Sequence, residues 1–361
     1  MIQYTVKYKR IPKKYSFSYF VLGCDIGGTN TNIGFFGVRN SVPEMLFSLN
    51  FKSQQISSLV PAINASLDYA LKNHKISVRE ACIAGAGPVS MGYDYCSPVN
   101  LKWDINAKYI LESTSLKSAF IINDFEALGY SINLLNVKKS MFKIRHNAHK
   151  HRGLSMATKA IIGGGTGLGK CILIYSKEHN AYLPMPSEGG HIDFPAQNNF
   201  EIKLLDFIKN HTGIGDSVSC EEILTGKGIE YIYLFLKELR GFKNTEATRS
   251  INSAVEKAPL ISKFRNSDSN CKETFRLYTI FYARIAKNFA LDVFARGGLY
   301  ISGGIAAKNS EIFRTEEFIV EFERVGKVQK ILQNIPIWVL TDYGAGMCGA
   351  AYAAVIRKYY S

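Results

Sequence analysis

The sequence predicts an α/β fold with an internal duplication, and three observations support this. A hydrophobic run at residues 20–26 leads into the turn Gly27-Gly28-Thr29, and a second run from residue 160 leads into Gly164-Gly165-Thr166. A further apolar segment follows each turn, as expected for two strands joined by a tight glycine turn. Elsewhere, short apolar segments alternate with stretches of helical periodicity. This alternation predicts a mostly parallel sheet, covered by helices, in each half of the chain.

The individual elements follow from local patterns. Apolar residues at fourfold spacing predict a surface helix at residues 58–74, and further helical patterns cover 221–239 and 273–294. Short apolar runs predict strands at 81–85, 119–122 and 298–302, the last of which leads into a third glycine turn at Gly303-Gly304. Small residues from position 346 to 359 predict a closing helix that can pack tightly.

The length of 361 residues exceeds what one core comfortably holds, so we expect two domains. We place a small α/β domain at residues 1–134 plus 341–361 and a large α/β domain at 135–340. Each of them would then carry one of the two glycine turns.

The composition argues against a membrane protein and against a disulfide framework. No apolar stretch reaches the roughly 18–20 residues that a membrane span needs, and no signal-peptide cleavage site follows the first apolar run. The seven cysteines form no Cys-x-x-Cys pair, which favours reduced thiols in a cytoplasmic protein. The net charge of +14 is spread along the chain except for two basic clusters, at residues 7–14 and 138–152. We interpret both clusters as solvated surface, the second as a loop between domains.

The glycine turns are candidate phosphate sites. Glycine lets backbone N–H groups approach a bound anion, and the threonine hydroxyl adds another donor. Two such turns in one chain suggest a scaffold that grips a polyphosphate from both sides. Asp25, just before the first turn, is placed where it could anchor a magnesium ion through water.

Asn123 and Asp124 follow directly after the apolar strand at 119–122. Ligands of open α/β sheets gather beyond the carboxyl ends of strands. There Asp124 can accept a proton from an attacking hydroxyl, and Asn123 can hold that hydroxyl with both functions of its amide. Considered alone, however, Asp124 is better explained as the cap of a helix that begins at Phe125.

Glu188, His191 and Glu221 are ambiguous one by one. Glu221 fits an acid in the first turn of a helix, and His191 fits a structural histidine. Together with Asp124 they supply several acceptors for the hydroxyl donors of a polyhydroxylated ligand. Trp103, close to Asn100, could lie against a sugar face, but we favour core packing for it.

Six segments, in this order along the chain, resemble the bacterial-type glucokinase family, the hexokinase-like branch of the actin and sugar-kinase superfamily. They are Asp25-Ile-Gly-Gly-Thr-Asn30, Ile122-Asn-Asp-Phe-Glu-Ala127, Gly164-Gly-Thr-Gly-Leu-Gly169, Glu188-Gly-Gly-His191-Ile-Asp-Phe194, Cys220-Glu-Glu-Ile-Leu-Thr-Gly226 and Tyr300-Ile-Ser-Gly-Gly-Ile305. The resemblance covers about residues 20–357. It implies a two-domain, actin-like ATPase fold of the ribonuclease-H-like type, with duplicated phosphate-binding turns and an interdomain cleft.

The resemblance also implies an activity, the phosphorylation of glucose at its 6-hydroxyl by ATP, a step of glycolysis. Asp124 would be the general base. The implied sugar-binding residues are Asn100, Asn123, Asp124, Glu188, His191 and Glu221. The implied residues for ATP and its Mg²⁺ are Asp25, Gly27, Gly28, Thr29, Asn30, Thr166, Gly167, Gly303 and Gly304.

The sequence departs from related proteins at two places. The second turn begins Gly163-Gly164 where family members often have proline, a small change because glycine tolerates the same turn. The related repressor and zinc-containing branch carries a cysteine cluster after its histidine. Here the next cysteine after His191 is Cys220, so we expect no structural zinc.

Several alternatives stay open at this stage. The sugar could be mannose or an N-acetylhexosamine, and the basic charge mildly favours inorganic polyphosphate as donor. A non-catalytic, sugar-responsive regulator is less favoured, since the residues before the first strand are too few for a winged helix. We therefore expect glucose and ATP as partners and neither nucleic acid nor membrane. The oligomeric state is open, with a homodimer as one option.

Overall fold

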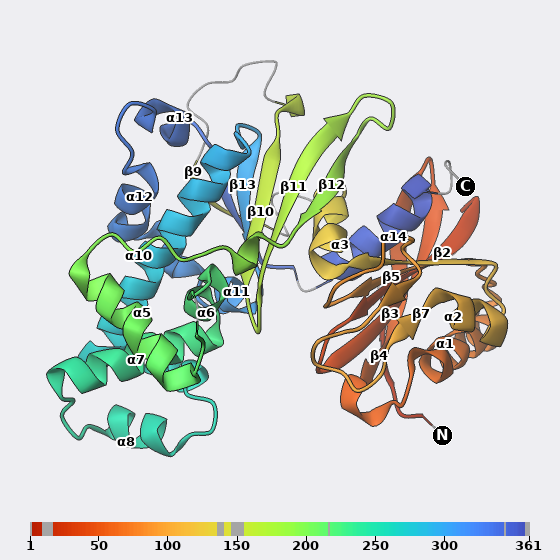
Figure 1. Cartoon of the computed structure of the whole chain (residues 1–361). Helices are drawn as coiled ribbons and strands as arrows, with labels where there is room; N and C mark the ends of the chain where they lie inside the picture. The colour runs from red at the N-terminus through yellow and green to blue at the C-terminus, as the bar shows by residue number, and fades with distance from the viewer. Residues whose placement is uncertain are drawn as a thin grey trace. The chain divides into compact units, whose positions relative to one another are not determined.

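Each of the two glycine turns joins neighbouring antiparallel strands of a six-stranded sheet. The first links β2 (Tyr19–Ile26) to β3 (Asn30–Arg39), and the second links β10 (Lys159–Gly164) to β11 (Leu168–Ser176). The computed structural model describes residues 2–8, 17–135, 141–145, 155–215, 217–342 and 344–357 (Figure 1).

The chain divides into two units. The first comprises Met1–Lys139, Tyr175–Pro186 and Asp342–Ser361, and the second Ser140–Ile174 and Ser187–Thr341. From the sequence we expected residues 175–186 in the large domain. In the structure Tyr175–Pro186 belongs to the first unit.

The two sheets share an order of five strands, β4-β3-β2-β5-β8 in the first and β12-β11-β10-β13-β14 in the second, and each has one further strand at an edge. The first runs β1-β4-β3-β2-β5-β8 and the second β12-β11-β10-β13-β14-β9. In both, the strand before the glycine turn pairs in parallel on its other side, β2 with β5 and β10 with β13. The remaining strands are β1 (Thr5–Tyr8), β4 (Val42–Lys52), β5 (Glu80–Gly85), β8 (Ser118–Asn123), β9 (Met141–Arg145), β12 (Ala181–Ser187), β13 (Gly298–Ser302) and β14 (Ile337–Leu340).

The expectation of mostly parallel sheets is wrong, because both sheets are mixed. In the first, β1, β4, β3 and β2 are antiparallel neighbours, and only β2, β5 and β8 run in parallel. In the second, β11 and β9 run antiparallel to their neighbours β10 and β14. The reason is geometric, since a short turn can join only antiparallel strands.

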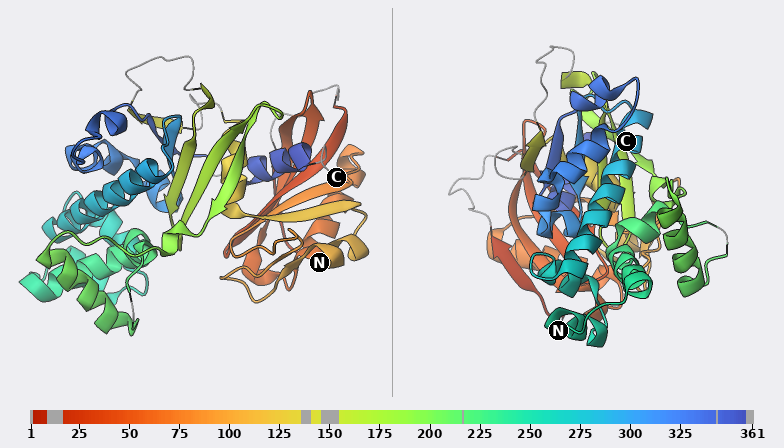
Figure 2. Two further views of the ribbon diagram at one scale, coloured as in Figure 1. Left: turned by 45° about the horizontal axis from the view of Figure 1, so that its top comes forward. Right: turned by 90° about the vertical axis from the view of Figure 1, so that its left-hand side faces the viewer.

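Helices cover both faces of the first sheet. On one face α1 (Leu59–His74) and α2 (Ala107–Ser113) pack on the inward side chains of β2, β3 and β4. On the other lie α14 (Ala345–Arg357) and, packed against it, α3 (Asp124–Ser131); the left view of Figure 2 shows α14 alongside the N-terminal strands. A glycine on β2 permits the close approach of α14: a Cβ at Gly23 would lie 2.3 Å from the Met347 carbonyl oxygen.

The second sheet packs against a helical layer with one continuous core, which joins Ile162 and Leu299 of the sheet to Tyr278 and Phe281 of the long helix α10. The helices are α5 (Asn199–Thr212), α6 (Cys220–Leu224), α7 (Gly226–Arg240), α8 (Glu246–Ser253), α9 (Ala258–Phe264), α10 (Ser269–Asp292), α11 (Gly304–Lys308), α12 (Glu316–Glu323) and α13 (Gln329–Gln333).

The single helix expected at 221–239 is two helices. Thr225 has an extended backbone between α6 and α7, and its side chain caps α7 by accepting a hydrogen bond from the Gly228 amide. Two glycines in the first turn of α7, residues 226 and 228, weaken helix propagation across this point. The helices expected at 58–74 and 273–294 correspond to α1 and α10.

The interpretation of residues 138–152 as a solvated loop is wrong for residues 141–145, which form β9 on the edge of the second sheet. Arg145 donates to the Ile335 carbonyl at 3.2 Å and pairs with Glu323, and the Lys143 ammonium lies 4.6 Å from the centre of the Trp338 ring. Residues 9–14, 138–140 and 146–152 of the two basic clusters lie outside the described residues, as do the last positions of the closing helix.

Candidate active site

Hydrogen bonds within the first unit hold the first glycine turn in place. Gly27 N–H donates to the Asn30 carbonyl at 3.0 Å, and the Ser53 hydroxyl donates to the Gly27 carbonyl at 2.6 Å. The side-chain Nε2 of Gln54 donates to the Gly28 carbonyl at 3.0 Å and to the Asn100 carbonyl at 3.1 Å. The turn's carbonyl oxygens are thereby engaged, and Thr29 is exposed at its tip.

Asn100 lies against this turn. A Cβ at Gly28 would lie 2.7 Å from the Asn100 Cβ, so the close approach requires glycine at this position. The structure thus places Asn100, predicted to bind sugar, directly beside the first predicted phosphate turn.

Asp25 faces a cavity of 1480 Å³, whose lining includes Gly27, Gly28, Thr29 and Asn30. Burial raises the pKa of the Asp25 carboxyl to about 6, and a hydrogen bond from Asn32 partly opposes this rise. A Cβ at Gly346 of α14 would lie only 3.1 Å from the Asp25 carboxyl carbon, so a larger side chain there would crowd the carboxylate.

A row of amides extends from Asp25 across the sheet. Asn32 pairs with Asp25 in the β2–β3 register, and Asn50 pairs with Asn32 in the β3–β4 register. Asn50 donates to the Asn32 side chain at 2.5 Å, while its own amide oxygen is buried and accepts no hydrogen bond from the described residues. A carboxylate with neighbouring amide oxygens is a set of hard oxygen donors, which suits Mg²⁺.

Asn123 and Asp124 stand at the junction between β8 and α3. Asn123, and not Asp124, is the helix cap: its side-chain oxygen accepts from the Phe125 amide at 2.8 Å, and its Nδ2 donates to the Gly87 carbonyl at 3.2 Å. Asp124 is the first helical residue, and its carboxylate also accepts from the Phe125 amide at 3.0 Å. The proposal that Asp124 is only a cap is therefore weakened, because the residue before it fills that position.

The second glycine turn is bound to the sugar candidate Glu221. Gly165 N–H donates to the Gly167 carbonyl at 2.9 Å and closes the turn, while Thr166 and Gly167 are exposed. The Glu221 carboxylate accepts from the Leu168 amide at 2.8 Å, and a Cβ at Gly167 would lie 2.8 Å from the same carboxylate oxygen. Glu221 therefore links the predicted sugar site to the predicted phosphate turn.

Glu188 and His191 lie on a segment that runs beside Glu221. Cys220 N–H donates to the Ile192 carbonyl at 2.8 Å, and Phe194 N–H donates to the Val218 carbonyl at 2.9 Å. The His191 ring lies 3.7 Å from the Glu188 carboxylate, with side chains 61% and 79% exposed. Both residues can therefore reach a ligand.

The third glycine turn lies against the second. Gly303 has a φ of +93°, and a Cβ at this position would lie 2.4 Å from the Gly164 carbonyl oxygen. Backbone angle and space both require glycine there. Gly304 is exposed at the start of α11.

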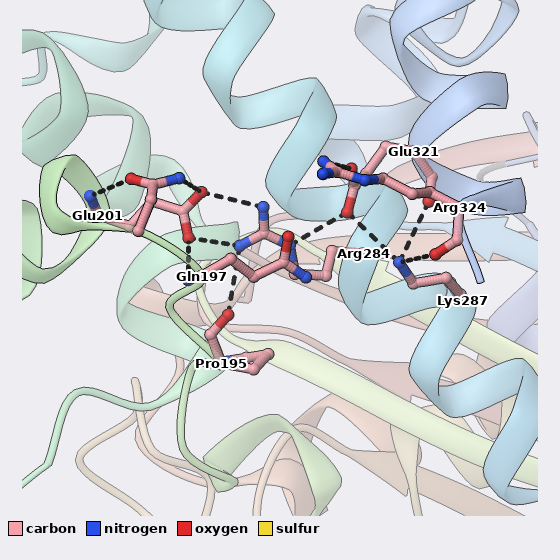
Figure 3. Close-up of polar contacts among 8 residues, drawn as sticks. Pro195, Gln197, Glu201, Arg284, Lys287, Glu321 and Arg324 are labelled. Carbon is pink, nitrogen blue, oxygen red and sulfur yellow. Dashed lines mark hydrogen bonds and ion pairs between the residues drawn. The ribbon is translucent and has the colours of Figure 1, made fainter. Parts of the chain in front are cut away.

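A buried ion network anchors the chain just after Phe194 (Figure 3). Arg284 of α10 binds both carboxylate oxygens of Glu201, at 2.6 and 3.0 Å, and also the Pro195 carbonyl at 3.2 Å. Its Nε donates to Glu321 at 3.2 Å. Lys287 donates to the same Glu321 carboxylate at 3.4 Å. The guanidinium thus fixes the loop that continues from the Glu188–Phe194 segment.

The predicted residues therefore form two groups. Asp25, Gly27 to Asn30, Asn100, Asn123 and Asp124 belong to the first unit; Thr166, Gly167, Glu188, His191, Glu221, Gly303 and Gly304 belong to the second. Among the described residues, no group of three or more histidine, cysteine or acidic side chains could hold a metal ion. Across those same residues, no helix combines the length and hydropathy needed to cross a bilayer.

Sequence reasoning missed several polar residues around the first turn, namely Asn32, Asn50, Ser53, Gln54 and Asp342. A signal for two of them was present. Asn32 and Asn50 are polar positions within otherwise apolar strands, and such positions often mark a face turned toward a ligand. Asp342, which follows β14 and lines the same cavity, is recognisable only once the chain is folded.

Comparison with known proteins gives one family for nearly the whole chain. The family model described as "Glucokinase" matches residues 22–356. The glucokinase of Trichormus variabilis is 32% identical over 348 residues, which span 92% of this chain and 98% of that protein. The glucokinase of Synechocystis sp. is 30% identical over 92% of this chain and 97% of its own length.

Solved structures agree on the fold. The glucokinase of an Antarctic psychrotroph has a TM-score of 0.74 at 24% identity and covers 93% of this chain and 98% of its own. The glucokinase of Balamuthia mandrillaris, solved in complex with glucose, has a TM-score of 0.77 at 21% identity, covering 93% of each chain. A ROK-family glucokinase from Streptomyces griseus, solved with glucose and AMPPNP, has a TM-score of 0.64 at 18% identity, covering 93% of this chain and 99% of its own. The fold is the actin-like ATPase fold of sugar kinases.

Proposed function

Since this chain belongs to the glucokinase family, we propose that it transfers the terminal phosphoryl group of ATP to the 6-hydroxyl of glucose. The bond between the γ-phosphorus and the bridging oxygen of ADP breaks, and a bond to the sugar oxygen forms. The products are ADP and glucose 6-phosphate, and the hydroxyl proton goes to the enzyme. The observation that supports this proposal is the 2.8 Å hydrogen bond from the Leu168 amide to Glu221, which joins the residue proposed to bind sugar to the turn proposed to bind phosphate.

Asp124 is the general base of this proposal. Its carboxylate takes the proton of the 6-hydroxyl, while Asn123, held by Gly87 and Phe125, keeps one amide hydrogen to orient the sugar. Glu188, His191 and Glu221 accept from or donate to the other hydroxyls. Phosphoryl transfer needs little covalent help from the protein, so positioning and charge stabilisation carry most of the rate enhancement.

The glycine turns bind the phosphates of ATP through backbone N–H groups and the Thr29 and Thr166 hydroxyls. The Asp25 carboxylate and its amide neighbours Asn32 and Asn50 would hold Mg²⁺, through water, at the first turn. The ion would neutralise charge on the transferred phosphoryl group. The turn at Gly303 and Gly304 lies against the adenosine in this proposal.

A coupled assay across sugars and donors tests the proposal. Glucose with ATP should give the highest kcat/KM, ahead of mannose and N-acetylglucosamine, and ATP should exceed inorganic polyphosphate at every salt concentration. A strong preference for polyphosphate that falls steeply with salt would show that the donor is wrong, since many counterions are released when a long polyanion binds.

We also propose a cytoplasmic location and a role at the first step of glycolysis. The seven cysteines are all free thiols, which suits a reducing compartment. Light scattering of the enzyme used in the coupled assay tests whether the active species is a homodimer.

A further inference from the structure

The N-terminal strand β1 lies before the region that the family model matches, which begins at residue 22. It pairs antiparallel with β4, with Thr5 opposite Asn50 and Lys7 opposite Ser48. The first sheet is thereby extended by one strand beyond the strand order that the two sheets share. The proposed function gives this strand no role.

The side chains of β1 alternate between two faces, and residues of both faces, Tyr4 and Tyr8 as well as Thr5 and Lys7, border the cavity at the first turn. Tyr4 and Tyr8 turn toward α1, where their rings contact Tyr69 and His74 at centroid distances of 6.1 and 5.9 Å. Because side chains alternate along a strand, Thr5 and Lys7 belong to the opposite face. That is the face on which α14 packs against Gly23.

The register places Thr5 in the row of Asp25, three strands away from it, and Lys7 one row further from the first phosphate turn. Asp25, Asn32, Asn50 and Thr5 are successive partners in one row across four strands. Lys7 lies one row further along the same face. All five residues line the 1480 Å³ cavity that also contains Gly27 to Asn30.

Charge in this cavity is mixed. Asp25 and Asp342 contribute carboxylates, and Lys7 and Lys52 contribute ammonium groups. Lys52 already donates to the Asn30 side chain at 3.0 Å, at the turn itself. A phosphate chain entering this cavity would meet the carboxylates of Asp25 and Asp342, so further positive charge on the cavity wall favours its binding.

We propose that β1 forms part of the phosphoryl-donor site and that the Lys7 ammonium binds the phosphate chain of the donor. This inference rests on the proposed function. It adds a donor-binding residue, contributed by the N-terminal extension, to the turns that the family resemblance implies. The strand positions Lys7 through its backbone pairing with β4, and the tyrosines on its other face fix it to α1.

A simpler explanation is that Lys7 only protects the sheet edge, because lysine on an edge strand discourages pairing with other chains. Edge protection requires a charge on the strand but does not require it to face the cavity. The two explanations therefore differ in their effect on donor binding.

The test compares Lys7→Met and Lys7→Glu with Lys108→Glu, an exposed lysine on α2 that does not line the cavity. Lys7→Met keeps most of the side-chain stem and removes the charge. We expect KM for MgATP to rise about threefold to tenfold in Lys7→Met, the usual loss for one exposed charged hydrogen bond, and further in Lys7→Glu. KM for glucose should stay unchanged in both, and Lys108→Glu should match wild type.

A second readout does not depend on catalysis. Isothermal titration with inorganic tripolyphosphate should show weaker binding for both Lys7 variants than for wild type and Lys108→Glu. Equal binding by all four proteins, or an equal rise of KM for MgATP in Lys7→Glu and Lys108→Glu, would overturn the proposal and leave edge protection. If wild type lacked kinase activity, the proposed function would fail, while the tripolyphosphate comparison would still decide the role of Lys7.

Discussion

Replacing Asp25 by asparagine should stabilise the first unit at neutral pH and leave its stability unchanged in acid. Burial raises the pKa of this carboxyl from 3.8 to about 6. The folded state therefore holds a proton more tightly than the unfolded state, and the wild type loses stability as pH rises from about 4 to 6. A pKa rise of this size corresponds to about 3 kcal/mol.

The free energy of unfolding of Asp25→Asn minus that of wild type should thus be near zero at pH 4. By pH 7 it should reach about 1–3 kcal/mol, because partial exposure of Asp25 screens some of the cost. The chain has two tryptophans, Trp103 in the first unit and Trp338 in the second. Urea unfolding followed by fluorescence in a Trp338→Phe background therefore reports on the unit that contains Asp25.

Asp68→Asn serves as the control, because Asp68 lies on α1 with its side chain 72% exposed. The difference in free energy of unfolding between Asp68→Asn and wild type should not change with pH. A difference for Asp25→Asn that falls as pH rises would refute the reasoning, since it would mean that the charged carboxylate is stabilised in the folded state.

Three further predictions concern the second unit. Glu188→Ala should raise KM for glucose and leave that for ATP unchanged. Glu221→Ala should raise both constants, because it also leaves the Leu168 N–H of the phosphate turn without an acceptor, which costs about 1–3 kcal/mol. Glu221→Gln keeps an acceptor oxygen and should leave KM for ATP unchanged. Identical steady-state constants for the two Glu221 variants would contradict this. Arg284→Met should cost about 3–5 kcal/mol of unfolding free energy by Trp338 fluorescence, and adding Glu201→Gln should recover part of it. A further loss in the double variant would refute the ion-network account.

Elements with a strong local signal could be predicted from the sequence. The spacing of Leu59 and Ile63 predicted α1, and the glycine turns predicted the strand pairs around them. These features depend on residues close in the chain. Asn123 and Asp124 were placed at a strand end for the same reason, and the structure locates them there.

Features that depend on distant residues could not be predicted. Arg284 meets Glu201 from a position 83 residues away, and nothing local to either residue indicates the partner. Lys7 and Arg145 were interpreted as solvated because their neighbours are basic, whereas pairing with β4 and β14 makes both segments edge strands. The break at Thr225 was missed because helical periodicity continues across it, although its glycines were visible.

The measurement that tests the central claim most directly is the turnover of Asp124→Asn with glucose and ATP, read as glucose 6-phosphate formed. If Asp124 takes the proton of the 6-hydroxyl, turnover should fall about 10²- to 10⁴-fold. Glucose binding, measured by titration calorimetry, should remain near that of wild type, and Asp68→Asn should lose nothing in either measurement. An Asp124→Asn protein that retains most of its turnover would contradict the account and leave Asp124 with only a structural role at the start of α3.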